Sequence, residues 1–268
     1  MSIINRIFGK HVKLSINENE NEIALTESGN EKVITFNNIV YSKLKKGSIL
    51  VDGYWDYFLP LPNYFNKINI NNIKNKNVVN VLVIGLGAGT IPYQMLQTYN
   101  NVKITALETS AAMIQITKEL LQKEDLKKLK IIYHDGYDYI NKNVAHLRNL
   151  YDLIILDAYI DDKIPDVFFE KQFIDNINFI LNNEGIFAIN FIQNTKNDLR
   201  LLIKNLKDYY KIYYLNTGLF SGNLIILNMK NKNRGINNLL QAFNGLQDNI
   251  KLEAYNYYAN IKSENKDY

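Results

Sequence analysis

Apolar runs alternate with segments of helical periodicity through most of the chain. From residue 78 onward, runs of strand length such as 81–84 and 153–156 are separated by segments with apolar residues three and four positions apart. Unbroken apolar strands are typical of a parallel sheet that is covered by helices on both faces. The alternation therefore predicts a doubly wound α/β domain. Its expected strands are 79–84, 103–107, 129–133, 153–156 and 185–190, and its expected helices are 91–99, 111–123 and 167–181.

The beginning of the chain follows a different pattern. Residues 1–65 contain short runs of alternating apolar and polar residues with turn residues between them, which predicts a small antiparallel β unit. Residues 66–77 are polar with isolated apolar positions, and we expect them to connect this unit to a larger domain at 78–268. The alternating runs are 11–15, 22–26 and 32–36.

The end of the larger domain also departs from strand–helix alternation. Two apolar runs, 211–214 and 224–227, are too close in sequence to enclose a full helix, so they predict a final antiparallel strand pair. With the five earlier strands they give a Rossmann-like, seven-stranded and mostly parallel sheet. A last helix is expected near 236–243.

Composition narrows the classes of function without naming one. The 268 residues carry a formal net charge of +4, which is spread along the chain, so a nucleic-acid partner is not expected. The chain has no cysteine, which excludes disulfides, iron–sulfur clusters and thiolate zinc sites. No apolar run approaches the roughly 18 residues of a membrane-spanning helix, and the first residues lack a signal-peptide pattern. We therefore expect a cytoplasmic protein without a membrane partner.

The strongest chemical signal is a Gly-x-Gly-x-Gly turn between the first strand and the first helix of the larger domain. Gly85 and Gly87 allow a tight turn and a close approach of the backbone to a ligand. Gly89 opens the helix, whose N-terminal amides face the same crevice. A glycine-rich turn without a ligand is the alternative, and the flanking strand and helix favour a binding site.

Two acidic residues follow the next two strands and make this signal more specific. Glu108 ends the second strand about 20 residues after the glycine turn, where a carboxylate can accept hydrogen bonds from both ribose hydroxyls. Asp135, followed by Gly136, comes after the third strand and can meet an adenine amino group. Each acid alone could be a helix N-cap, but together with the turn they predict an adenosine pocket. Thr90 stands where the NAD fingerprint needs glycine or alanine, so a nucleoside without phosphates is favoured.

With these motifs the chain resembles the class I S-adenosylmethionine-binding fold and, within it, the spermidine synthase family of polyamine aminopropyltransferases. The likeness covers about residues 10–230. The family's Gly-Gly-Gly-Asp-Gly corresponds to Gly85-Leu-Gly-Ala-Gly89, and its catalytic aspartate falls on Asp157 at the end of Tyr151-Asp-Leu-Ile-Ile-Leu-Asp157. The resemblance implies aminopropyl transfer from decarboxylated S-adenosylmethionine to a small polyamine-type amine. It also implies direct displacement without a metal, in a homodimer or homotetramer.

The acceptor side of the site is expected around Asp157. It ends the fourth strand, and a carboxylate there could accept the proton that an amine loses before it attacks the carbon next to the sulfonium. Tyr54 and Trp55 could form an aromatic wall for a cation, with packing between the two units as the alternative. Tyr159 and Asp161 follow in the same loop as Asp157 and are further acceptor contacts, with a capping loop as the alternative.

The departures from the family pattern keep two other functions open. The family's glycine-turn aspartate, which holds the donor's terminal amine and repels the carboxylate of S-adenosylmethionine itself, is Ala88 here. The family's glutamine in the first unit is Tyr41, and its histidine or glutamine is Trp55. Ala88 favours the first alternative, a methyltransferase that uses intact S-adenosylmethionine. The second alternative is a nucleoside-binding protein without catalysis.

Overall fold

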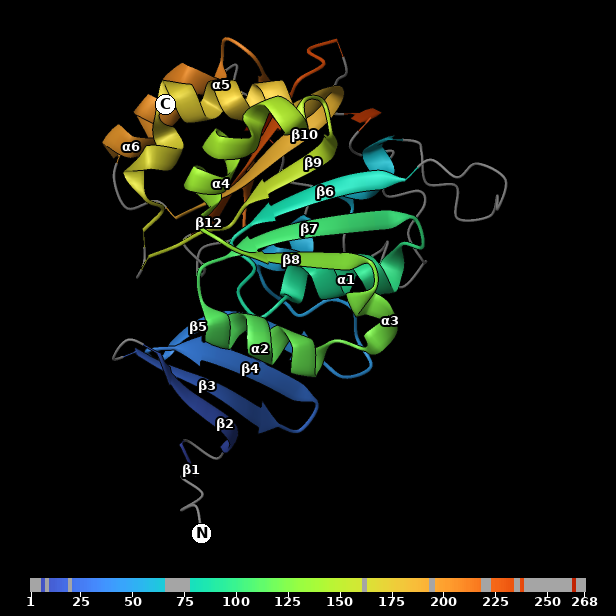
Figure 1. Cartoon of the computed structure of the whole chain (residues 1–268), viewed down its shortest axis with the longest axis vertical. Helices are drawn as coiled ribbons and strands as arrows, with labels where there is room; N and C mark the ends of the chain where they lie inside the picture. The colour runs from blue at the N-terminus through green and yellow to red at the C-terminus, as the bar shows by residue number, and fades with distance from the viewer. Residues whose placement is uncertain are drawn as a thin grey trace.

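The structure is a computed structural model that describes residues 6–7, 10–18, 21–65, 78–160, 163–192, 196–217, 223–233, 237–238 and 262–263. These residues form a small antiparallel sheet near the N-terminus and a larger mixed sheet with helices on both faces (Figure 1). The connecting segment expected at 66–77 lies outside the described residues. Of the helix expected near 236–243, only 237–238 are described, and both are helical.

The N-terminal unit is an antiparallel sheet, as the alternating pattern predicted, and it has five strands in chain order. Its strands are β1 (Arg6–Ile7), β2 (Lys10–Glu18), β3 (Asn21–Ser28), β4 (Glu31–Phe36) and β5 (Ile39–Lys45). Asn37 and Asn38, with φ of 47° and 66°, make the tight turn between β4 and β5. Asparagine tolerates this conformation better than most residues, which suits it to such hairpins.

The larger sheet confirms the prediction of seven mostly parallel strands. Its strands are β6 (Val79–Ile84), β7 (Val102–Glu108), β8 (Leu129–Tyr133), β9 (Tyr151–Leu156), β10 (Leu181–Ile192), β11 (Lys211–Asn216), β12 (Asn223–Met229) and β13 (Lys262–Ser263). They lie in the order β13-β11-β12-β10-β9-β6-β7-β8. Neighbours from β10 to β8 are parallel, whereas β12 runs antiparallel to β10 and β11. The two-residue β13 adds an edge strand that the sequence pattern did not predict.

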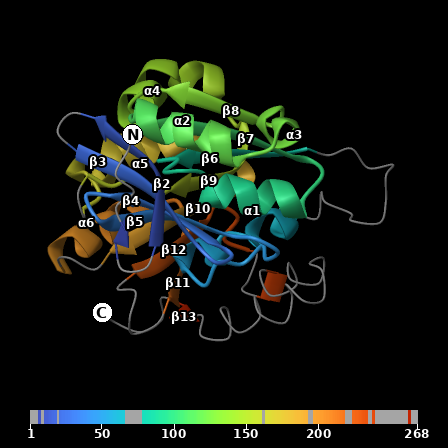
Figure 2. The same cartoon turned by 90° about the horizontal axis from the view of Figure 1, so that it is seen from below.

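Helices cover both faces of the larger sheet (Figures 1 and 2). They are α1 (Thr90–Thr98), α2 (Ala111–Leu120), α3 (Lys123–Leu126), α4 (Gly136–Asn143), α5 (Lys171–Ile180) and α6 (Lys196–Leu206), with short 3₁₀ turns η1 (Tyr54–Tyr57), η2 (Leu61–Phe65), η3 (Val144–Leu147) and η4 (Asp166–Phe169). Side chains alternate between the faces of a strand, so Leu153 and Ile155 of β9 pack with α1 and η2, while Ile154 and Leu156 pack with α5 and α6. Among the described residues, no helix is long and apolar enough to cross a membrane.

Two of the expected helices differ from the structure. The helix expected at 111–123 ends at Leu120, because Leu121 turns to extended backbone (ψ 148°) while its side chain stays in the core. The helix expected at 167–181 is divided into η4 and α5, and β10 begins directly after Ile180. Neither α4 nor α6 was predicted.

The N-terminal sheet is attached to the larger domain at the turn after β6. The hydroxyl oxygen of Ser42 in β5 accepts a 2.8 Å hydrogen bond from the backbone N–H of Ala88. The Thr90 hydroxyl group accepts a hydrogen bond from the N–H of Lys43 and donates one to its carbonyl oxygen. The N-terminal unit therefore fixes the backbone of the glycine turn. An apolar cluster packs below it, made of Ile23, Leu25, Ile34, Ala88, Ala112, Met113 and Ile116.

Replacing Ser42 with Ala is expected to lower the free energy of unfolding by about 1–3 kcal/mol, because the buried N–H of Ala88 loses its acceptor. Urea unfolding measures the loss. Ser15→Ala is a suitable control, since the Ser15 hydroxyl bonds Glu22 on the surface, and it should change stability by less than about 0.5 kcal/mol. If both variants unfold alike, the Ser42 contact does not stabilise the turn.

Candidate active site

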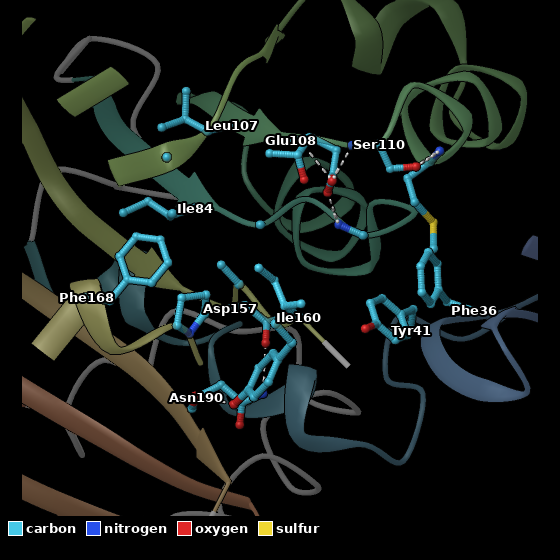
Figure 3. Close-up of a pocket in the computed structure, with 18 of the residues that line it drawn as sticks. Phe36, Tyr41, Ile84, Leu107, Glu108, Ser110, Asp157, Ile160, Phe168 and Asn190 are labelled. Carbon is cyan, nitrogen blue, oxygen red and sulfur yellow. Dashed lines mark hydrogen bonds between the residues drawn. The ribbon is translucent and has the colours of Figure 1, made fainter. Parts of the chain in front are cut away.

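A cavity of about 500 Å³ opens at the carboxyl ends of β6, β7, β8, β9 and β10, which is where parallel α/β sheets bind ligands. Residues of β4, β5 and η1 form its other wall, so both sheets contribute to it (Figure 3). Most of the site residues expected from sequence line this cavity together: Tyr54, Gly85, Gly87, Glu108, Asp135, Gly136, Asp157 and Tyr159.

The glycine turn brings the ends of β6 and β9 into contact. Gly85 has a φ of 89°, and a Cβ atom added to it would lie 2.3 Å from the backbone oxygen of Asp157, so a side chain has no room here. This contact holds Asp157 beside the turn. Gly89 begins α1 next to Thr117 and does not line the cavity, so its role is in the turn itself.

Glu108, expected as a ribose acceptor, anchors the glycine turn. Its Oε2 accepts hydrogen bonds from the backbone N–H groups of Leu86 and Gly87, both at 3.0 Å. Its Oε1 accepts from Thr109 and Ser110 at 2.8 and 2.9 Å (Figure 3). Burial raises the pKa of Glu108, although these four donors oppose the rise. Because a carboxylate offers about four lone-pair positions, ribose hydroxyls must share or replace some of these bonds.

The next strand end supplies a cap and an apolar wall. Asp135 is the N-cap of α4, because its Oδ1 accepts a 2.8 Å hydrogen bond from the N–H of Asp138. The capping interpretation is thus correct for Asp135, although its side chain also lines the cavity. Ile84, Leu107 and Phe168 lie on the same side of the cavity (Figure 3). This arrangement offers a polar edge and an apolar face to a flat ring.

Asp157 lies at the centre of a polar network that crosses three elements. Its Oδ1 accepts a 2.8 Å hydrogen bond from Nδ2 of Asn190 in β10, and its Oδ2 accepts a 3.3 Å bond from the hydroxyl of Tyr54 in η1. Asn190 in turn accepts a 2.8 Å bond at Oδ1 from Nδ2 of Asn223. The Tyr159 hydroxyl donates to the backbone oxygen of Asn190. The carboxylate is therefore held in one orientation from two sides.

Burial and charge oppose the ionisation of the groups in this network. Removal from water raises the pKa of Asp157 to about 7, despite the opposing hydrogen bonds from Asn190 and Tyr54, and the Glu108 charge adds to the rise. Burial and the charge of Asp157 hold the pKa of Tyr54 and of Tyr159 well above the usual range. Near neutral pH, Asp157 therefore exchanges a proton while both tyrosines stay neutral. Such a carboxylate is suited to accept a proton from an amine.

Trp55 and Ala88, which were both singled out from sequence, do not line the cavity. Trp55 is 6% exposed and packs in the core beside Tyr54, so of the two aromatic residues expected here only Tyr54 lines the cavity, together with Tyr159. Ala88 is fully buried in the apolar cluster below the turn, so its side chain does not border the donor space. Asp161 lies outside the described residues.

The sequence analysis missed the two asparagines that support Asp157. Asn190 and Asn223 are both buried and line the cavity. Each is a polar residue in or beside an apolar strand run, at the strand end that faces the site. A polar residue at such a position is the signal that could have indicated them.

The strand order, the glycine turn and the strand-end carboxylate are those of the class I methyltransferase fold. The chain belongs to the spermine/spermidine synthase family, because the model of the spermine/spermidine synthase domain matches residues 68–239.

Curated relatives are distant and of two kinds. Over 194 residues the chain is 25% identical to a polyamine aminopropyltransferase of Prochlorococcus marinus, which covers 68% of this chain and 65% of that protein. Over 143 residues it is 28% identical to an eEF1A lysine and N-terminal methyltransferase of Xenopus laevis, which covers 50% of this chain and 20% of that protein. The chain spans about a fifth of the length of the first curated relatives it matches. Both kinds of relative are transferases.

Solved structures agree on the fold. A probable spermidine synthase from Corynebacterium glutamicum has a TM-score of 0.67 at 14% identity, with 95% of this chain and 96% of that chain covered. Human methyltransferase-like protein 13 in complex with SAH has a TM-score of 0.60 at 21% identity, with 73% and 89% covered. At these identities the likeness shows a shared fold alone.

Proposed function

We propose that this protein transfers an aminopropyl group from decarboxylated S-adenosylmethionine to a polyamine-type amine. The observation that carries the proposal is Asp157, a strand-end carboxylate with a pKa of about 7 in a chain of the spermine/spermidine synthase family. The polyamine aminopropyltransferase match supports it, because it covers about two thirds of both chains.

In the proposed reaction, the adenosine part of the donor binds at the Glu108 and Asp135 end of the cavity. The acceptor ammonium binds beside Tyr54 and Tyr159, whose rings stabilise its charge, and loses a proton to Asp157. The neutral nitrogen then attacks the carbon next to the sulfonium. A C–N bond forms as the C–S bond breaks, and methylthioadenosine leaves as the neutral thioether. Displacement is direct, and the cavity supplies the alignment of the two substrates.

Methyl transfer from S-adenosylmethionine itself is the second candidate. The eEF1A lysine and N-terminal methyltransferases among the relatives favour it. The glycine turn also lacks the carboxylate that repels the donor's methionine carboxylate elsewhere in the family, although the Ala88 side chain at that position faces the apolar cluster and not the cavity. In this candidate Asp157 accepts the proton of an amine that becomes methylated.

The identity of the released nucleoside tests the two candidates directly. Purified protein is incubated with either donor and a panel of mono- and diamines, and the products are separated by chromatography. Aminopropyl transfer is expected to release methylthioadenosine, and the decarboxylated donor should bind at least about tenfold more tightly, or about 1.4 kcal/mol.

Asp157→Asn protein is the control for contaminating activity in this assay. Release of S-adenosylhomocysteine, with tighter binding of intact S-adenosylmethionine, would replace aminopropyl transfer with methyl transfer. Stoichiometric binding of both donors without turnover on any amine would contradict both candidates and support a nucleoside-binding protein.

A further inference from the structure

A chain of two side-chain amides extends from Asp157 into the sheet. Asn223 donates from Nδ2 to Oδ1 of Asn190, and Asn190 donates from Nδ2 to Oδ1 of Asp157, both at 2.8 Å. Asn190 is 1% exposed and Asn223 is 7% exposed, so water competes little for these bonds. The link from Asn223 to the carboxylate of Asp157 therefore passes through Asn190.

Strand pairing fixes this arrangement. In the antiparallel pair of β10 and β12, Asn190 lies opposite Ile225, and Asn223 lies opposite Ile192. The two asparagines are therefore diagonal neighbours on one face of the sheet. In the parallel pair of β9 and β10, Leu156 lies opposite Ile189, which brings Asn190 next to Asp157. We call the hydrogen-bonded series Asn223, Asn190 and Asp157 the relay, and it lies at the carboxyl edge of the parallel strands.

We propose that Asn223 is a positioning residue that, through Asn190, determines how readily Asp157 accepts a proton. The catalytic consequence rests on the proposed function, in which Asp157 takes the proton of the acceptor amine. The relay itself concerns the unliganded protein and does not depend on which group is transferred.

The direction of an amide explains how Asn223 can act at a distance. A carboxamide has a donor end and an acceptor end, and Asn223 occupies the acceptor end of Asn190 with an N–H group. The donor end must then face Asp157, where it stabilises the ionised carboxylate. If Asn190 turned over, its oxygen would face the carboxylate and favour the protonated form. Asn223 thus selects the orientation that keeps the pKa of Asp157 from rising further.

Other groups that face Asp157 do not provide this control. Tyr54 donates to its Oδ2, and the pKa of Tyr54 is held well above the usual range by burial, so it stays neutral. Tyr159, which is also neutral, donates to the backbone oxygen of Asn190 and leaves the amide free to turn. The Glu108 carboxylate adds negative charge and raises the pKa of Asp157.

The test is an NMR titration of ¹³C-labelled aspartate carboxyl groups in the unliganded protein, with Asp157→Asn used to assign the signal. Asn223→Leu keeps a similar size and removes the donor, and it is expected to raise the pKa of Asp157 by about 1. Asn228→Leu is the matched control, because Asn228 is buried in the same strand but donates to the backbone of Phe187, and it should leave that pKa unchanged. An unchanged pKa in Asn223→Leu would overturn the relay.

A double-mutant cycle separates the relay from other effects. In an Asn190→Leu background, Asn223→Leu should no longer shift the pKa of Asp157, since the intermediate amide is gone. If Asn223→Leu does not fold, Asn223→Asp serves instead. Asn223→Asp should raise the pKa of Asp157 more than Asn223→Leu does, and more than half of that rise should be lost in the Asn190→Leu background. A shift of equal size with and without Asn190 would contradict the relay.

Turnover connects the relay to catalysis. At pH 7, Asn223→Leu should lower kcat/KM about fivefold and regain the wild-type value near pH 9, where Asp157 is ionised in both proteins. A wild-type protein without any transfer activity would refute the proposed function, while the NMR result would still decide the relay. A loss of kcat/KM that is equal at all pH values would show that Asn223 contacts the substrate instead.

Discussion

Asp157→Asn protein is expected to turn over at least about 100-fold more slowly than wild type, while its affinity for methylthioadenosine stays nearly unchanged. The amide keeps the shape of the side chain and can still accept a bond from Asn190, but it cannot take a proton from an amine. Initial rates with saturating donor and acceptor, together with calorimetric binding of the nucleoside, measure both quantities. Near-normal turnover would mean that Asp157 has a structural role only.

The same substitution should make the protein more stable at high pH. Burial raises the pKa of Asp157 from its ordinary value near 3.8 to about 7 in the folded state, so folding disfavours the ionised form. The favourable contribution of the protonated group is complete below pH 4 and is lost as the pH rises through 7. The amide of Asp157→Asn does not ionise, so this variant does not lose stability as the pH rises through 7. At pH 8 it should be more stable than wild type by roughly 2–4 kcal/mol.

Asp152, a buried aspartate in the strand that precedes Asp157, provides the control for both effects. Asp152 lies at the opposite end of β9, where it accepts hydrogen bonds from the backbone of Asn80 and from the Asn182 amide. Asp152→Asn should lower stability and leave kcat unchanged. Urea unfolding at pH 5 and pH 8 tests the pH dependence, because Asp157→Asn should gain stability relative to wild type between these pH values.

The larger sheet could be predicted because its strands are buried on both faces. Such strands are apolar without interruption, and the prediction placed β6 and β8 at their observed bounds.

The helix α4 was not predicted, and the reason lies in its composition. Its residues are mostly polar, its start depends on the Asp135 cap, and only Gly136 and Ile140 are fully buried. A helix of this kind has too few apolar residues to show the three-and-four apolar spacing from which the other helices were predicted.

The candidate site could be predicted where its residues follow directly from strand ends. Glu108 and Asp157 each come at or after the end of a buried parallel strand, so topology brings them to one edge. Asn190 and Asn223 are each visible as a polar residue at a strand end, but their contact depends on the pairing of β10 with β12, which no local pattern reveals. Ala88 shows a further limit of sequence-based prediction. The sequence gives its position in the turn but not the direction of its Cβ atom. The structure directs that atom into the cluster with Ile23 and Ile34.

Replacing Glu108 is expected to impair both nucleoside binding and the glycine turn. In Glu108→Ala, four backbone N–H groups lose their acceptor, and a bound ribose loses its charged partner. A hydrogen bond to a charged group contributes about 1.5–3 kcal/mol, so the affinity for methylthioadenosine should fall about 10- to 100-fold. Isothermal calorimetry of the folded variant measures this loss, and urea unfolding measures the accompanying destabilisation.

Glu108→Gln separates the two roles of this side chain. The amide keeps one oxygen, which can still accept hydrogen bonds from two of the four N–H groups. Its NH₂ group faces the other two N–H groups. The turn is therefore weakened less than in the alanine variant only if the side chain shifts to move the NH₂ group away from them. Neither variant retains the charge that strengthens bonds from ribose hydroxyls, so both should bind the nucleoside weakly. Glu124→Gln, on the exposed side of α3, controls for loss of charge alone. Wild-type affinity in a folded Glu108→Gln protein would exclude the carboxylate from the nucleoside site and confine it to anchoring the turn.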